Sequence, residues 1–392
     1  MFHILFAHGE HWKRLRTSIN PAFSTGKLKS YCNLLQNSEQ ELMHLFKESA
    51  ANGETIDLAA AFQLLAFDVI GEVAFGIDLK AIKTKGKGSP LLIQLLDLFK
   101  LQNIPNPVLD TLRVIPTLIP LTKWLLNFCS KHELGMFKVI GNILNMSREV
   151  SENRRNDPSS RRNDLLQMMI DSPTLSQKEV TAMSFVLLQA GVETTSNTIT
   201  YCAYSLAKHP DFQEKLREEV FEHFPKQGEV DVVLDYDVIM NKMEYLDWVC
   251  KETLRLYPVG FGIVHRFVCN DTDLCGIHLE KGKCHSVLVD MWTVHHDVKL
   301  WGPRDPYEFD PNRFAPEQSS GRPELAFLSF GYGPRQCVGM RLALFEIKLT
   351  ITNLIRNFKL ELPEKDLDIF SRENLLIINP MGGKVPMKLK KI

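Results

Sequence analysis

The pattern of apolar positions predicts one long helix through the core of this protein. Ser176 and Glu179 form a capping box at its start, and the next proline is Pro210. A helix over about residues 176–208 extends roughly 45–50 Å at 1.5 Å per residue. Its first half is apolar on all sides, which is typical of a buried helix. The sequence therefore predicts a core helix long enough to cross a whole domain.

A second apolar run predicts a buried helix near the end of the chain. Its apolar positions are Met340, Leu342, Ala343, Leu344, Ile347 and Leu349. Gly331, Gly333 and Pro334 predict a tight loop before it. Cys337 therefore lies where a loop enters a helix, and there the helix dipole and the unpaired amides favour a thiolate, which can ligate a metal. The alternative for a lone cysteine is a buried small apolar residue.

The remaining pattern predicts a mainly α protein with small β-sheets. Residues 37–105 have the spacing of amphipathic helices joined by short loops, and the polar stretch 151–164 predicts an exposed loop. Segments 264–269 and 285–290 have the character of a strand pair. A strand-like hairpin and a basic tail, residues 388–391, end the chain.

Length and composition exclude several classes of protein. The chain has 392 residues, of which 44% are hydrophobic and 24% charged, so it can bury a large core. Its net charge of -1 argues against a general nucleic-acid-binding protein. The eight cysteines contain no Cys-x-x-Cys pair, which favours reduced thiols in a cytosol-facing protein over a disulfide framework or a zinc site. Because no run of eighteen apolar residues occurs, no transmembrane helix is expected.

The loop around Cys337 resembles the haem-ligand signature of the cytochrome P-450 family. Every fixed position of that signature is matched, by Phe330, Gly333, Arg335, Cys337 and Gly339. The resemblance implies that Cys337 is the axial iron ligand of haem b, that Phe330 packs beside its sulfur and that Arg335 pairs with a haem propionate. Gly339 leaves space for a large flat ligand against the backbone. Thiolate ligation pushes electron density towards the iron and favours O–O bond cleavage.

A second motif of the same family lies in the long helix, over residues 190–195. A carboxylate and a hydroxyl in an apolar helix are costly unless they are partnered or functional. The resemblance implies a helix that opens locally over the haem, with Ala190 and Gly191 beside the cofactor. Thr194 would hold dioxygen or a water molecule, and Glu193 would help to relay protons. The alternative is a threonine that hydrogen-bonds to a carbonyl one turn earlier.

The substrate pocket that the resemblance implies includes Gln189, Ala190, Phe261 and Ile377. Gln189 replaces the large apolar residue that is usual at its position, and it puts a polar group at the cavity wall. Ile377 belongs to the strand-like hairpin, near the expected cavity.

The pair Glu252 and Arg255, three residues apart on a helix, resembles a further motif of the family. An exposed pair of this kind contributes only a few tenths of a kcal/mol, so a solvated pair is the alternative. The family implies a buried structural pair that a later arginine closes, and Arg313 occupies that place. Asn312 departs from the usual glutamate before that arginine.

Further propionate contacts follow from the resemblance. Trp12 and Arg16 lie four residues apart, on one face of a predicted helix that is similar to helix C of the family. An ordinary surface pair is the alternative. Arg266, in the first strand of the predicted pair, is another candidate.

Two adjacent histidines, His295 and His296, do not predict a metal site. Neighbouring residues on a strand or an irregular segment point apart, and no third ligand lies at metal spacing.

The resemblance spans essentially all 392 residues as a single haem-binding domain. The part similar to helix C begins within the first sixteen residues, so a membrane anchor, a first helix, two strands and a substrate-contacting loop of the family are expected to be missing. The strands at 264–269 and 285–290 would then lack partners, and an unpaired edge invites strand addition. The haem cavity would also be open to water on one side.

Residues 164–172 resemble the microsomal family-three branch, which contains drug- and steroid-metabolising enzymes and thromboxane synthase. In related enzymes the region that corresponds to residues 114–128 dips into the membrane. That segment is strongly apolar, is broken by Pro116 and Pro120 and carries Trp124, which suits the membrane interface. A buried core connection is the alternative. The implied location is the cytosolic face of the endoplasmic reticulum membrane.

The resemblance implies a monooxygenase that inserts one atom of dioxygen into a lipophilic small molecule of the steroid, fatty acid or xenobiotic class. Electrons would come from NADPH through a flavoprotein reductase that docks on the thiolate side. Lys13, Arg14 and Arg341 form a candidate basic landing patch, with a merely solvated face as the alternative. Two other functions stay open: a haem-thiolate isomerase of the thromboxane-synthase type, and a truncated, catalytically impaired haem protein.

Overall fold

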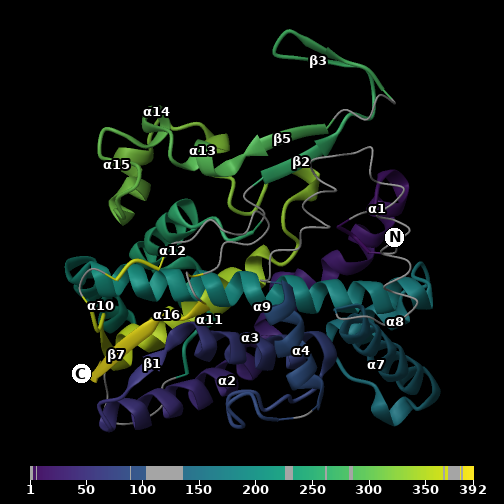
Figure 1. The fold of residues 1–392 in the computed structure, drawn as a ribbon, viewed down its shortest axis with the longest axis horizontal. Coiled ribbons are helices and arrows are strands. Elements are labelled where there is room, and N and C mark those ends of the chain that lie inside the picture. Colours follow the sequence, from purple (N-terminus) through teal and green to yellow (C-terminus); the bar gives the residue numbers. More distant parts are fainter. Residues whose placement is uncertain are drawn as a thin grey trace. The chain divides into compact units, whose positions relative to one another are not determined.

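The long helix predicted from the capping box is present, and the chain folds into two compact units. The computed structural model describes residues 3–5, 7–88, 90–102, 136–225, 233–260, 263–281, 286–364, 367–369, 380 and 383–392. Unit 1 contains residues 1–47 and 60–196, and unit 2 contains residues 48–59 and 197–392. Helix α9 (Gln177–Lys208) contributes residues to both units (Figure 1). The fold is mainly α-helical with small antiparallel sheets, as the sequence predicts.

Unit 1 is built from helices (Figure 1). Its elements are α1 (Gly9–Ile19), a 3-10 helix (Asn20–Phe23), α2 (Thr25–Ala51), α3 (Leu58–Phe75), α4 (Pro90–Gln102), α7 (Met136–Asn156), a 3-10 helix (Pro158–Ser160), α8 (Leu165–Asp171) and the first part of α9. The end of α2 and the beginning of α3 belong to unit 2.

The exposed loop predicted over residues 151–164 is wrong in its first part. Helix α7 continues to Asn156, and Ser151 and Arg154 on it are buried. The Nη1 atom of Arg154 donates to Oδ1 of Asp164 at 2.7 Å, and both side chains are 5% exposed. A buried charge must be paired, so this ion pair holds the end of α7 inside the unit.

Helix α3 departs from the amphipathic pattern expected for residues 37–105. It is apolar on nearly all sides, and it is long and apolar enough to cross a membrane, as no other helix in the described part of the chain is. Within the protein, 72% of it is buried, which is the environment of a core helix. Its Asp68 carboxylate accepts the amides of Ala81 and Ile82 at 2.7 and 3.0 Å, which attaches the following segment to the helix.

Unit 2 combines helices with small sheets (Figure 1). Its helices are the second part of α9, α10 (Pro210–His223), α11 (Tyr236–Asn241), α12 (Glu244–Leu256), α13 (Met291–His295), α14 (Val298–Trp301), α15 (Pro316–Ser319) and α16 (Met340–Asn357), with 3-10 helices at Pro311–Phe314, Glu324–Ala326 and Gly333–Arg335. Its strands are β1 (Thr55–Asp57), β2 (Ile263–Phe267), β3 (Thr272–Leu274), β4 (Ile277–Leu279), β5 (Ser286–Asp290), β6 (Phe358–Glu361) and β7 (Pro386–Lys391).

The strand pair predicted at 264–269 and 285–290 is confirmed as β2 and β5. The two strands are antiparallel, with Ile263 opposite Asp290 and Phe267 opposite Ser286. Among the described residues, no third strand joins this sheet. Strands β3 and β4 form a separate hairpin.

The basic tail predicted at residues 388–391 is instead part of a strand. Strand β7 lies between β1 and β6 and is antiparallel to both. Met387 and Leu389 are buried, whereas Lys388 and Lys390 are exposed. This alternation is that of a strand with one covered face, so the lysines are the outer side of a sheet.

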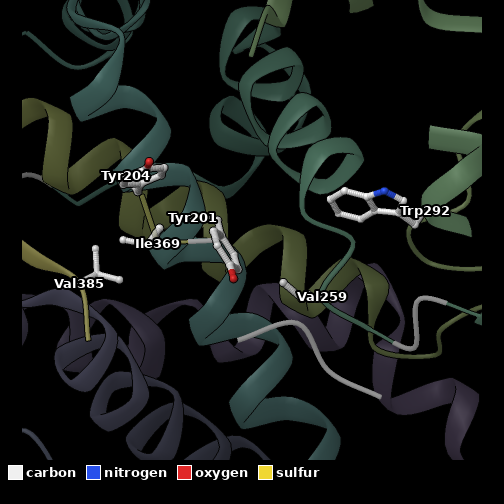
Figure 2. Close-up of a cluster of buried hydrophobic side chains, with 6 residues drawn as sticks. All are labelled: Tyr201, Tyr204, Val259, Trp292, Ile369 and Val385. Atoms are coloured by element: carbon white, nitrogen blue, oxygen red, sulfur yellow. The ribbon is translucent and has the colours of Figure 1, made fainter. Parts of the chain in front are cut away.

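Figure 2 shows a buried cluster in unit 2 that joins the second part of α9 to segments far away in the sequence. Its members are Tyr201, Tyr204, Val259, Trp292, Ile369 and Val385. The ring of Tyr201 stacks on Tyr257, with centroids 4.4 Å apart. The hydroxyl of Tyr204 donates to the carbonyl of Leu367 at 2.7 Å. Aromatic packing and one partly buried hydrogen bond therefore fix this end of the helix.

An acidic cluster lies on α3 and the segment after it. Burial, followed by the charges of Asp78, Asp68 and Glu41, raises the pKa of Glu72 from 4.5 to about 7. A raised pKa in the folded state means that ionisation of the carboxyl destabilises the fold. This group therefore lowers the free energy of unfolding progressively as the pH rises from 4.5 to about 7.

We expect Glu72→Gln to stabilise the protein above pH 7 and to change little near pH 4.5. The amide does not ionise, so the variant avoids a loss of about 1–2 kcal/mol, after allowance for solvent screening. Chemical denaturation of both proteins at acidic and at mildly alkaline pH measures the difference. Glu152→Gln, at an exposed position of α7, is the control. An equal gain at both pH values would contradict the raised pKa.

Candidate functional site

The candidate thiolate lies immediately before helix α16 in unit 2. Cys337 is exposed, and α16 begins three residues later, at Met340. The amide of Cys337 donates to the carbonyl of Phe330 at 2.9 Å, which closes the loop on itself. The alternative of a buried apolar cysteine is therefore wrong. The predicted position, where a loop enters a helix, is confirmed.

The glycines of this loop differ in backbone conformation. Gly331 and Gly333 have φ angles of 71° and 77°, a left-handed conformation that side chains rarely adopt. Gly339, the N-cap of α16, has a φ of -84°, which every residue can adopt. The backbone therefore requires the first two glycines but does not require a glycine at position 339, where the space left for a flat ligand stays a prediction.

Two guanidinium groups lie beside this loop. Arg266 on β2 donates from Nη2 to the carbonyl of Tyr332 at 3.3 Å. Burial lowers the pKa of Arg335, and the positive charge of Arg266 lowers it further. Two cations held close together in this way suit the binding of carboxylates. The residues present would therefore fit the propionate carboxylates of a haem at this loop.

A buried carboxylate between two arginines lies in the same unit. Oε2 and Oε1 of Glu252 accept from Nε and Nη2 of Arg255, each at 2.7 Å, and both side chains are fully buried. Nε of Arg313 lies 3.3 Å from Oε1 of Glu252. Burial raises the pKa of Glu252, and the hydrogen bonds and charge of Arg255 oppose that rise. The structure thus brings the three side chains together and excludes a solvated pair.

The departure at Asn312 leaves this cluster intact. The side chain of Asn312 donates to Oδ1 of Asp310 at 2.8 Å and accepts from Nζ of Lys215 at 3.1 Å. Arg313 donates to the carbonyl of Asp305 at 2.6 Å and to that of Trp301. The side chain of Asn312 therefore bonds to Asp310 and Lys215, and Arg313 makes the buried contact with Glu252.

His295 is a residue that the sequence did not single out for a role at this site. Its Nδ1 donates to the carbonyl of Arg255 at 3.1 Å, and its Nε2 accepts from the amide of Leu328 at 2.8 Å. Both ring nitrogens are therefore engaged. Among the described residues, no group of three or more His, Cys, Asp or Glu side chains is arranged to hold a metal ion.

The threonine motif on α9 lies in unit 1, in regular helix. The hydroxyl of Thr194 donates to the carbonyl of Ala190 at 2.6 Å, and α9 is a continuous helix from Gln177 to Lys208. The local opening implied by the family is therefore wrong for this structure. Glu193 is buried, Thr194 and Gln189 are half-buried, and Ala190 is exposed.

Gly191 has a packing role in unit 1. A Cβ built at this position would lie 2.9 Å from Cδ1 of Ile70 on α3. A side chain at position 191 would therefore require the end of the Ile70 side chain to shift. The cofactor contact that the family resemblance implies for Gly191 stays a prediction.

Trp12 and Arg16 lie one turn apart on α1 in unit 1, and both are half-buried. Two other residues of α1, His11 and Arg14, attach this helix to Glu179 of α9. Nη1 of Arg14 lies 3.1 Å from Oε2 of Glu179, and Nε2 of His11 lies 2.9 Å from Oε1 of the same carboxylate. The hydrogen bond from Arg14, the largest cause, helps to lower the pKa of Glu179 to about 2. Arg14 is therefore a structural cation.

Three sequence predictions fall outside the described residues. They are the pocket residues Phe261 and Ile377 and the apolar segment 114–128.

Comparisons with known proteins show which family of proteins the chain is similar to. The cytochrome P450 family model matches residues 2–387. Cytochrome P450 3A41 of Mus musculus is 32% identical over 395 residues, which cover 95% of this chain and 73% of the relative. Cytochrome P450 3A12 of Canis lupus familiaris is 33% identical over 377 residues, with 93% and 71% covered.

We expect Glu252→Gln to lower the free energy of unfolding by about 3–5 kcal/mol, because it leaves two buried guanidinium groups without a counter-charge. Chemical denaturation measures the change. Glu244→Gln, at an exposed position on the same helix, should have little effect. Equal free energies of unfolding for the two variants would show that the charge of Glu252 does not stabilise the fold.

Proposed function

The chain belongs to the cytochrome P450 family and is a haem monooxygenase of lipophilic substrates, and from that premise we propose how its own residues serve the reaction. Proteins of this family carry haem b, which activates dioxygen when a thiolate binds its iron. We place the axial ligand at Cys337. The observation that carries this assignment is an exposed cysteine at the start of α16, held by its amide and accompanied by two guanidinium groups.

The propionates are the second part of the proposal. Arg266 and Arg335 would neutralise the carboxylates, because their own mutual repulsion is relieved when an anion binds between them. Trp12 and Arg16 on α1 would contribute further contacts, since they project from one face of the helix. Phe330 and Gly339 would border the haem on the cysteine side.

Proton delivery is assigned to α9. The hydroxyl of Thr194 uses its proton in the bond to the Ala190 carbonyl, and its oxygen keeps lone pairs that accept from a water molecule. Rotation about χ1 would release that proton towards the reacting oxygen. The buried carboxylate of Glu193, one residue earlier, would resupply it through water.

The substrate is a lipophilic molecule of the steroid, fatty acid or xenobiotic class. Gln189, which is half-buried one turn before Glu193, would offer a hydrogen bond to a polar group on that molecule. Ala190 would leave room beside it. An isomerase of the thromboxane-synthase type is second, because the hydroxyl of Thr194 has no task in an isomerisation.

Electrons would reach the haem from NADPH through a flavoprotein reductase. Arg341 is exposed on the first turn of α16, next to the cysteine loop, and Lys13 is exposed on α1. Each of these two cations would offer a positive charge to the reductase, whereas Arg14 is excluded because its guanidinium binds Glu179. We place the protein at the cytosolic face of the endoplasmic reticulum, in line with the resemblance of residues 164–172 to the microsomal branch.

We expect Cys337→Ala to abolish the thiolate band in the carbon-monoxide difference spectrum of the reduced protein, together with all turnover. Alanine offers no ligand atom, and no other exposed cysteine in the described residues precedes a long helix. Cys275→Ala, in the turn between β3 and β4, is the matched control and should keep the band. A thiolate band that survives in Cys337→Ala would refute the assignment.

We expect Thr194→Ala to keep haem bound but to divert reducing equivalents to hydrogen peroxide, because ordered proton delivery is lost. The ratio of product formed to NADPH consumed measures the coupling. Thr181→Ala is the control, since the hydroxyl of Thr181 makes the same kind of bond on the same helix, to the Gln177 carbonyl at 3.0 Å. If the two variants couple equally well, Thr194 acts only as a helix residue.

A further inference from the structure

The backbone segment before the cysteine loop is held by two hydrogen bonds from other elements. The amide of Leu328 donates to Nε2 of His295 on α13 at 2.8 Å. The hydroxyl of Ser329 donates to the carbonyl of Leu254 on α12 at 2.9 Å. Both Leu328 and His295 are buried. The loop that carries the cysteine therefore starts from a point fixed to two helices.

The hydrogen bonds of His295 define its tautomer. A carbonyl only accepts, so Nδ1 must carry the proton that it donates to Arg255 at 3.1 Å. An amide only donates, so Nε2 must present a lone pair to Leu328. Burial lowers the pKa of His295 to about 3, which keeps the ring neutral. Phe327 stacks on the ring, with centroids 5.6 Å apart and planes inclined by 10°.

On its other side, His295 is bonded to the buried ion cluster. Nη1 of Arg255 donates to the His295 carbonyl at 2.8 Å, so residue 295 is bound to Arg255 through both its backbone and its ring. The same guanidinium is fixed by the two oxygens of Glu252. A rigid, fully buried charge pair thus determines where the imidazole lies.

The connection continues from Leu328 to the cysteine. The carbonyl of Leu328 accepts from the amide of Gly331 at 2.7 Å, which forms a turn. Inside this turn lies Phe330, whose carbonyl accepts from the amide of Cys337 at 2.9 Å. A shift of Leu328 would therefore move the acceptor that holds the cysteine backbone.

We propose that His295 is a positioning residue for Cys337. Its neutral imidazole, with the proton on Nδ1, bridges the Glu252–Arg255 pair to the Leu328 amide and so transfers the fixed geometry of the buried cluster to the cysteine loop. This inference rests on the proposed role of Cys337 as the axial ligand. It predicts that the ring is needed for its acceptor nitrogen as well as for its volume.

Three variants separate the hydrogen bonds from packing. His295→Phe keeps an aromatic ring against Phe327 but leaves the Leu328 amide without its acceptor. His295→Gln restores an acceptor oxygen near the position of Nε2. His296→Phe is the matched control, because this buried neighbour is the C-cap of α13 and donates from Nδ1 to the Trp292 carbonyl of the same helix at 2.9 Å.

Two measurements on the purified haem-loaded proteins test the proposal. The first is amide hydrogen exchange at Leu328, which we expect to be roughly ten- to a hundredfold faster in His295→Phe, as for a buried amide that loses its partner. The second is the share of reduced protein whose carbon-monoxide spectrum has the thiolate band. We expect this share to fall in His295→Phe, to recover at least in part in His295→Gln and to stay unchanged in His296→Phe.

The possible failures can be told apart. If the wild-type chain itself has no thiolate band, the proposed role of Cys337 fails. Exchange at Leu328 then still tests the hydrogen bond between the Leu328 amide and His295. Unchanged exchange and an unchanged thiolate share in His295→Phe would overturn the inference. Equal losses in His295→Phe and His296→Phe would also overturn it, because general damage to the core would then be the cause. If His295→Phe does not fold, His295→Gln alone tests the inference. Slow exchange at Leu328 and a thiolate share close to that of the wild type would support it. Fast exchange together with a strongly reduced thiolate share would overturn it.

Discussion

The carboxylate of Glu252 is the charge on which the architecture of unit 2 depends. It is fully buried, so its desolvation is tolerated only with a complete set of partners. Arg255 and Arg313 supply the charge, and both guanidinium groups also donate to backbone carbonyls. Those carbonyls belong to His295, Trp301, Arg304, Asp305, Pro306 and Glu308. One buried negative charge therefore organises α12, α13 and the irregular segment that follows them.

From this cluster the constraint reaches the chemistry. The Cys337 loop must be exposed to receive a ligand, and an exposed loop cannot be fixed by its own packing. Its geometry comes instead from buried contacts at its base, through Leu328 and Ser329, and from the glycine turns within it. The site thus combines an accessible side chain with an immobile backbone.

Unit 1 uses a second carboxylate in a similar way. Glu179 caps the start of α9 through Ser176 and binds His11 and Arg14 of α1, which holds the two helices together. The missing side chain of Gly191 lets Ile70 of α3 pack close to the same helix. The residues proposed to deliver protons therefore lie on a helix that contacts with α1 and α3 hold in place.

Local features were determined by the sequence alone. The capping box, the helix from Gln177 to Lys208, the loop-to-helix position of Cys337 and the β2–β5 pair depend on residues close together in the chain, or on contiguous motifs that resemble a family. Only the tertiary structure decided which partners distant groups acquire. It made the basic end of the chain a central strand, paired Arg154 with Asp164, closed the Thr194 hydroxyl onto Ala190 and gave His295 two distant backbone partners. Composition and spacing say that a charge or a polar ring must be satisfied when it is buried, but which atoms satisfy it depends on the segments that the fold brings together.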